Sequence, residues 1–145
     1  MTPEERKKIA YDYMVQGYNC CQSTVLAFKD IFPVDEVGLE KITMSMGGGV
    51  GQMRDVCGAV SGMALVLGAV YGCEGVDKEK KADLNNRVKA LGASFKKTNG
   101  STICRELTGL SETCTTPIKR EDGRDCKDFV ADFVKEIAEY LEENK

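Results

Sequence analysis

The 17 residues 56–72 are almost entirely apolar, with Ser61 as the only polar side chain among them. Such a run is either a short membrane span or a helix buried inside a protein, and its length is at the lower limit for crossing a bilayer. Because the rest of the chain is amphipathic and contains no tryptophan to anchor a span, we predict a buried helix and no membrane span.

The same segment carries glycine at positions 58, 62, 68 and 72. These residues form two small-x-x-x-small pairs, which allow neighbouring helices to approach closely. Within one chain the pairs would bring other helices against this segment. Between two chains they would also permit a homodimer, and the sequence leaves both open.

Helix signals recur along the remainder of the chain. Thr2 precedes Pro3 with Glu5 following, and Asn19 is followed three residues later by Gln22, so both read as N-caps with a capping box. No segment alternates with the period of two that a strand requires. We therefore predict an all-α fold: one domain, residues 1–145, in which about five to six helices surround the buried glycine-rich helix. The expected helices are 3–16, 20–32, 36–46, 56–72, 78–99 and 126–141, with a short turn at 102–107 and a loop at 108–124.

The chain has seven cysteines and no histidine. This excludes Ser-His and Cys-His catalytic pairs, Cys₂His₂ zinc fingers and C-x-x-C-H haem attachment. A net charge of −3 without a basic stretch argues against nucleic-acid binding. The charged start, residues 1–8, is not followed by an apolar h-region, so we expect a cytoplasmic protein, in which cysteines more often serve redox or metal chemistry than structural disulfides.

Four expected helices begin with a cysteine in or near the first turn: Cys20, Cys57, Cys104 and Cys126. The first N–H groups of a helix lack partners and carry partial positive charge, which favours the thiolate. We expect these four cysteines to converge near the glycine-rich turn 47–51. Cys57 is the predicted most reactive thiol, because Gly58 and Gly62 should leave it accessible, and these two glycines are the candidate cofactor contacts.

The other three cysteines are expected to be accessory. Cys21 neighbours Cys20, and adjacent side chains on a helix point about 100° apart, so only one of the two should face a shared site. Cys73 ends the apolar helix, and Cys114 lies in the loop. No C-x-x-C occurs, which excludes a zinc ribbon, a thioredoxin motif and a ferredoxin run, so any shared site must be assembled by tertiary packing. Residues 47–51 match no nucleotide-binding glycine motif, and we expect them to lie closely against the Cys57 helix end.

Several residues resemble one known family. These are Asn19-Cys20 with Gln22, the glycine run 47–49, and the hexapeptide Cys57-Gly58-Ala59-Val60-Ser61-Gly62, followed by Cys104 and Cys126. The chain resembles the redox-active proteins of bacteria and archaea that are named for a C, CGAxxG, C, C pattern. The resemblance implies redox or metal chemistry at Cys20, Cys57, Cys104 and Cys126. Cys21 stands where the family usually has a small residue. A related domain occurs in a haem protein, but this chain has no haem-attachment motif.

The sequence leaves three functions open. The leading one is thiol redox chemistry, in which low-pKa cysteines cycle between dithiol and disulfide or pass electrons to an unidentified partner. The first alternative is a Cys₄ site for Zn²⁺ or an iron–sulfur cluster. The second alternative is a non-enzymatic helical interaction module whose cysteines only fill the core, since cysteine is often buried as a small apolar residue.

Overall fold

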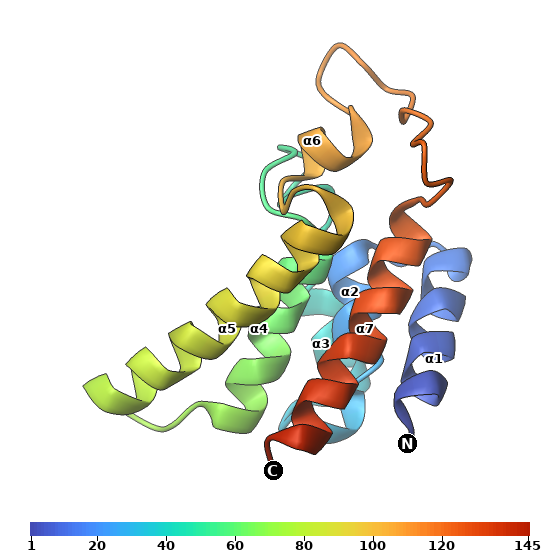
Figure 1. The fold of residues 1–145 in the computed structure, drawn as a ribbon. Coiled ribbons are helices and arrows are strands. Elements are labelled where there is room, and N and C mark those ends of the chain that lie inside the picture. Colours follow the sequence, from blue (N-terminus) through green and yellow to red (C-terminus); the bar gives the residue numbers. More distant parts are fainter.

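The computed structural model describes residues 1–145 as seven α-helices and one 3₁₀ turn, without a strand (Figure 1). The predicted all-α class is confirmed, and the helices outnumber the expected five to six because the short turn expected at 102–107 is the helix α6. The elements are α1 (Pro3–Gln16), α2 (Cys20–Leu26), η1 (Lys29–Ile31), α3 (Glu36–Ile42), α4 (Gly58–Tyr71), α5 (Lys78–Asn99), α6 (Cys104–Thr108) and α7 (Cys126–Glu143).

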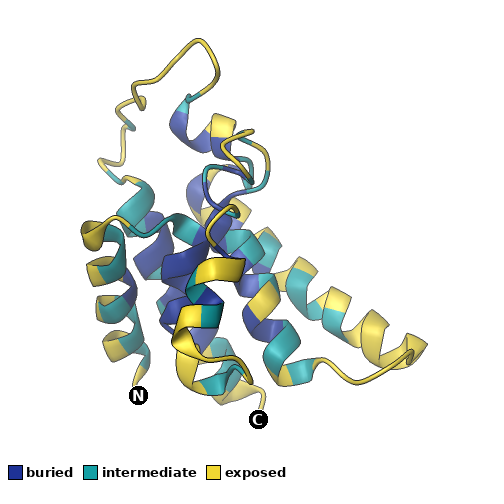
Figure 2. Cartoon of the chain, turned by 180° about the vertical axis from the view of Figure 1, so that it is seen from behind, coloured by how far each residue is buried: buried dark blue, intermediate teal, exposed yellow.

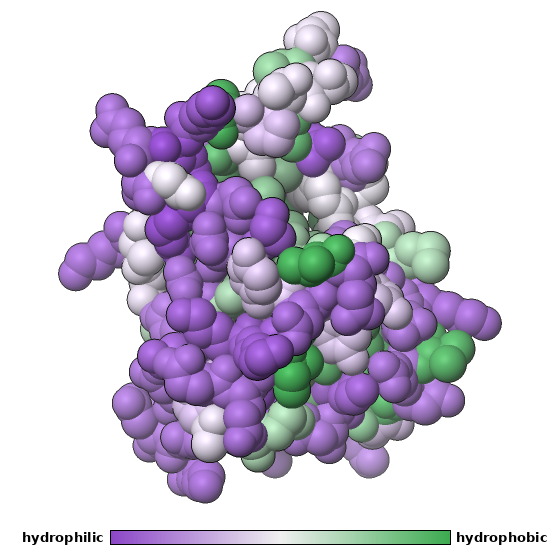
Figure 3. All heavy atoms as spheres, turned by 90° about the vertical axis from the view of Figure 1, so that its right-hand side faces the viewer, coloured by the Kyte–Doolittle hydropathy of each residue, from purple (hydrophilic) through white to green (hydrophobic).

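The core forms where α1, α2, α4 and α7 meet. The first and last helices, α1 and α7, run side by side in opposite directions, and α4 packs against α2, α5 and α7 (Figure 1). Phe95 of α5 meets Phe133 of α7 edge-on, with ring centroids 4.9 Å apart. Burial is concentrated in this centre, whereas the start of α5 and the loop 108–124 are exposed (Figure 2). The face on the α1 and α7 side is mostly hydrophilic, with scattered apolar groups (Figure 3).

Local capping signals explain where most helices begin. Asn19 accepts a hydrogen bond from the Gln22 amide at 2.8 Å, and the Gln22 side chain accepts one from the Asn19 amide at 3.1 Å. Thr2 with Glu5 and Asp125 with Asp128 form equivalent capping boxes. Each box satisfies amides that have no partner inside the helix. The predicted starts of α1, α2, α5 and α7 are therefore confirmed.

Three predicted boundaries are wrong. The helix expected over 20–32 ends at Leu26 and continues as the 3₁₀ turn η1. The helix expected to reach Met46 stops at Ile42, and turns follow it. The apolar helix begins at Gly58 rather than Val56, because Val56 forms an antiparallel bridge with Ile103.

The apolar helix α4 is buried on one side only, since Leu65 is 40% exposed and Val70 is 44% exposed. Its first glycine pair lies against α2: a Cβ on Gly58 would stand 2.6 Å from the Cys21 amide nitrogen, and one on Gly62 would stand 2.7 Å from the Thr24 Cβ. Gly68 has no neighbour within 4 Å of that position. The first pair therefore serves a contact within the chain, and in the second pair only Gly68 has open space beside it.

None of the helices carries an apolar stretch long enough to cross a membrane.

Candidate functional site

The four cysteines at helix starts line one cavity of about 90 Å³. Cys20, Cys104 and Cys126 are the first residues of α2, α6 and α7, and Cys57 is the N-cap of α4. The starts of α4 and α7 lie at the same end of the bundle, below the short helix α6 (Figure 1). The structure thus brings together the four residues that the sequence selected.

A short backbone pairing holds Cys57 beside Cys104. The Cys57 amide donates to the Thr102 carbonyl at 2.8 Å, and the Cys104 amide donates to the Asp55 carbonyl at 2.6 Å. The Val56–Ile103 bridge lies between these two hydrogen bonds. This pairing fixes the starts of α4 and α6 relative to each other, although about 47 residues separate them in the chain.

Close packing at Gly58 brings Cys20 to the same place. A Cβ on Gly58 would stand 2.7 Å from the Cys20 Cβ, so only glycine allows α2 to approach α4 at this point. On the other side of α2, Gly47 lies against the Asn19 side chain, whose Nδ2 donates to the Met44 carbonyl at 2.9 Å. The packing of α2 against Gly58 on one side and Gly47 on the other holds its first turn in position.

The glycine-rich run forms a left-handed turn beside the cavity. Residues 48–52 all have positive φ, and three of the five are glycine. This conformation costs an ordinary residue about 1–2 kcal/mol, which explains the glycines. The Arg54 amide donates to the Gly48 carbonyl at 2.9 Å, and the Asp55 amide donates to the Gly49 carbonyl at 3.0 Å. The expected close approach therefore exists, and it positions the segment that leads into Cys57.

Arg54, which follows this turn, is a cation at the cavity that the sequence did not predict. Arg54 lines the cavity, and its Nη1 lies 3.8 Å from the Cys104 Sγ. Its positive charge helps to lower the pKa of Cys126. The available signal was the position of Arg54, which is the only basic residue between the glycine run and the Cys57 hexapeptide.

Cys20 and Cys126 form an asymmetric pair. A hydrogen bond from Cys20 is the largest influence on Cys126 and lowers the pKa of Cys126 to about 7, against the opposing effects of burial and Asp125. The same interaction, together with burial, raises the pKa of Cys20 well above its usual value. Cys126 is therefore the thiol that ionises first, and Cys20 is the one that keeps its proton.

The expectation that Cys57 is accessible is wrong, and burial disfavours the thiolate that its predicted reactivity requires. Cys57 is only 6% exposed, and burial raises its pKa to about 12. The amides of Ala59 and Val60 at the helix start act in the predicted direction, but their effect is smaller than that of burial. Loss of solvation for a buried charge outweighs the field of a helix end.

These cysteines and their order in the chain also identify its relatives. Residues 18–140 match the family model described as "Putative redox-active protein (C_GCAxxG_C_C)". The chain belongs to this family. No curated protein and no solved structure matches it.

The family label writes the hexapeptide as GCAxxG, whereas this chain reads Cys57-Gly58-Ala59-x-x-Gly62. Packing explains the glycine at position 58 here, since α2 leaves no space for a side chain. Gly58 also lines the cavity, but the equivalent space at Gly62 is filled by Thr24. The cofactor contact expected at Gly62 stays a prediction, and helix packing already accounts for that glycine.

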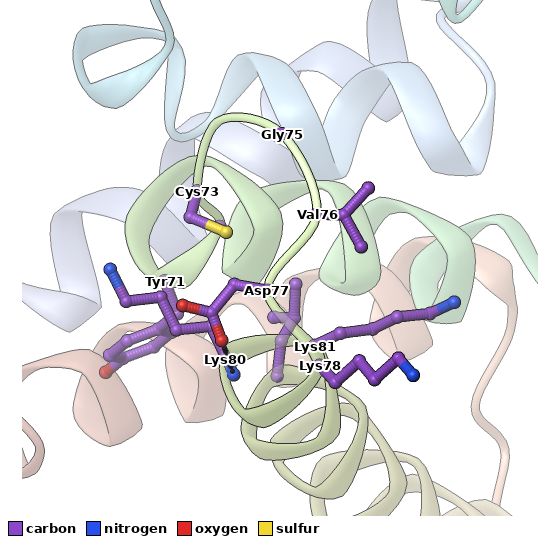
Figure 4. A pocket seen from close by; sticks show the side chains of 10 residues that line it. Tyr71, Cys73, Gly75, Val76, Asp77, Lys78, Lys80 and Lys81 are labelled. Carbon is purple, nitrogen blue, oxygen red and sulfur yellow. Dashed lines mark hydrogen bonds between the residues drawn. The ribbon is translucent and has the colours of Figure 1, made fainter.

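The remaining three cysteines do not line the cavity that the four helix-start cysteines share. Cys21 is fully buried in a separate small core with Leu39, which agrees with the prediction that one of the adjacent thiols faces the site. Cys114 is exposed in the loop 108–124. Cys73 is exposed in a hollow at the turn between α4 and α5, among Lys78, Lys80 and Lys81 (Figure 4).

All seven thiols are free in this structure. No group of three or more cysteine or carboxylate side chains is arranged so that it could hold a metal ion. The Cys₄ metal alternative stays a prediction.

Proposed function

We propose that this chain is a thiol redox protein in which Cys20 and Cys126 cycle between dithiol and disulfide. In the forward direction the two thiols lose two protons and two electrons to an acceptor and form one S–S bond. The observation that carries the proposal is that Cys20 and Cys126 line the same cavity, where the interaction with Cys20 lowers the pKa of Cys126 to about 7. A thiolate formed at neutral pH is the species that attacks a disulfide.

The neighbouring groups fit this role. Cys20 and Cys126 are both partly exposed, and Cys126 also lines a cleft through which it can meet a partner, so Cys20 serves as the second thiol. Arg54 supplies positive charge for the thiolate. Cys57 and Cys104 line the same cavity but are buried, so we expect them to be oxidised only after the first pair. A cytoplasmic location, where dithiols are returned to the reduced state, suits such a cycle.

The test counts thiols before and after oxidation. Reduced protein and protein treated with hydroxyethyl disulfide are alkylated and analysed by peptide-resolved mass spectrometry. We expect oxidation to remove two alkylatable thiols and to yield a peptide pair linked through Cys20 and Cys126. The matched controls are Cys73→Ser and Cys114→Ser, which should leave that linkage intact, whereas Cys20→Ser should abolish it.

An unchanged thiol count would refute the proposal and favour the alternative in which the cysteines only fill the core. That alternative predicts that Cys126→Ser changes stability without changing any reaction with disulfides. A linkage confined to Cys73 and Cys114 would refute the proposed pair as well.

A further inference from the structure

A second cleft opens directly beside Cys126. It has a volume of about 340 Å³, within the range of small-molecule sites. Leu107, Thr108, Cys126 and Phe129 line both this cleft and the cysteine cavity, so the two spaces meet at the Cys126 side chain. A molecule in the cleft would therefore lie beside Cys126 without entering the cavity that Cys57 lines.

The lining of this cleft combines cations with apolar surface. Arg120, Arg124 and Lys127 line it, whereas Asp125 is its only carboxylate. The apolar part comes from Met14, Pro117, Ile118 and Phe129. The two guanidinium groups lie over the Phe129 ring, 4.8 and 5.3 Å from its centroid. An arginine held flat against an aromatic ring is a fixed and poorly hydrated donor, which suits carboxylate recognition.

Existing ion pairs leave part of this donor capacity unused. Arg120 bonds Asp122 through Nε and Nη2, and its Nη1 makes no hydrogen bond within the protein. Arg124 bonds Asp132 and Asn99 through its two Nη atoms, and its Nε makes none. Lys127 gives one hydrogen bond, to Asp125 at 3.0 Å. An incoming carboxylate could use the free donors without breaking these pairs.

We propose that this cleft binds a small disulfide that carries carboxylates and presents its sulfur atoms to Cys126. The inference rests on the proposed function, for which it names the substrate class. The Cys126 thiolate attacks one sulfur of the ligand, the S–S bond breaks, and the first product leaves as a thiolate that takes a proton from water. Cys20 then loses its proton and attacks the Cys126 sulfur, which releases the second thiol. Two protein thiols become one disulfide, and their two electrons reduce one ligand disulfide to two thiols.

The test compares three small disulfides of different charge: dithiodipropionate (anionic), hydroxyethyl disulfide (neutral) and cystamine (cationic). The rate at which Cys126 becomes modified is measured by quenched alkylation and mass spectrometry. Each rate is divided by the rate of the same disulfide with free mercaptoethanol, which removes differences in intrinsic reactivity. We expect the normalised rates to fall in the order anionic, neutral, cationic, and the difference to shrink at high ionic strength.

The variants Arg120→Gln and Lys127→Gln should each slow the anionic disulfide by about fivefold, the effect of one charge about 4 Å away in water. Neither should slow the cationic disulfide. Arg87→Gln is the matched control, because Arg87 also stacks on an aromatic ring, that of Tyr71, and pairs with a carboxylate, but lines neither space. Lys127 is partly exposed and makes no buried contact with Asn99 as Arg120 does, so its variant keeps the test valid if Arg120→Gln fails to fold.

Two outcomes would overturn the proposal in different ways. Equal normalised rates for the three disulfides, or equal losses in Arg120→Gln and Arg87→Gln, would refute the substrate class and leave the Cys20–Cys126 chemistry standing. No reaction of Cys126 with any of the three would refute the proposed function itself.

Discussion

Removing the Cys20 thiol should change the pH dependence of the rate at which Cys126 reacts with disulfides, and the structure gives the size of the change. In Cys20→Ala the hydrogen bond to Cys126 is lost, while burial and Asp125, which oppose ionisation, remain. The pKa of Cys126 should then rise from about 7 to at least its ordinary value of about 9. At pH 7 the thiolate fraction falls from roughly one half to roughly one hundredth.

The rate changes less than this fraction does, because a more basic thiolate is a better nucleophile. With a Brønsted coefficient of 0.4–0.5, a rise of two pKa units makes the thiolate itself roughly eightfold more reactive. Cys20→Ala should therefore react about sixfold more slowly than the wild type at pH 7 and about sevenfold faster at pH 10, where both thiols are ionised. The two pH–rate profiles should cross.

The assay follows modification of Cys126 by neutral hydroxyethyl disulfide between pH 5 and 10, located by mass spectrometry. Cys21→Ala is the matched control: it removes the adjacent thiol, which is buried in the second core, and should leave the Cys126 profile unchanged. Profiles that share one midpoint in the wild type and Cys20→Ala would refute the assignment of the low pKa to this pair.

Three further predictions concern packing, alkali and the missed cation. Gly58→Ala should lower the free energy of unfolding by about 1–3 kcal/mol, because the added methyl group overpacks against α2. Gly68→Ala in the same helix should raise it by about 0.5–1 kcal/mol. Urea denaturation measures both changes. The pKa of Cys57 is about 12 in the folded protein and roughly 8.5 in the unfolded chain, so the unfolded state loses the proton first as pH rises. The free energy of unfolding, measured in reductant, should therefore fall between about pH 9 and 12. Cys57→Ala should flatten this pH dependence. Arg54→Gln should move the midpoint of the Cys126 profile upward by less than Cys20→Ala does, and Arg105→Gln, which removes an exposed guanidinium bound to Asp55, should not move it.

The sequence was informative about the site wherever local hydrogen bonds decide the structure. The starts of α2 and α7 depend on Asn19 with Gln22 and on Asp125 with Asp128, pairs that are three residues apart. Such signals are complete within one helical turn, so the positions of Cys20 and Cys126 could be predicted. The prediction that these cysteines form one functional site extends beyond the local signals and depends on the experiments above.

Properties that depend on distant residues were predicted poorly. The observed start of α4 lies two residues after the predicted one because Val56 pairs with Ile103, and no residue close to Val56 in the chain indicates that pairing. The burial of Cys57 follows from the same pairing. A helix end contributes about 0.3–1 kcal/mol to a nearby charge, whereas full burial can shift a pKa by 3–5 units, so burial reversed the expected direction of the Cys57 pKa shift.

The two thiols of the proposed pair also come from distant parts of the chain, and this bears on whether the protein would be an oxidant or a reductant. A disulfide between residues 20 and 126 would close a loop of about 106 residues, and a loop of that length constrains the unfolded chain by about 4.7 kcal/mol. Folding and disulfide formation form a thermodynamic cycle. A disulfide that stabilises the fold by this free energy is therefore itself stabilised by the fold to the same extent. The low pKa of Cys126 opposes this by stabilising the reduced form, but a thiol with a pKa near 7 is only half ionised at pH 7, which contributes about 0.4 kcal/mol. The first effect is larger by roughly tenfold, so equilibration with glutathione should show a reducing dithiol, and a strongly oxidising one would contradict the pairing of Cys20 with Cys126.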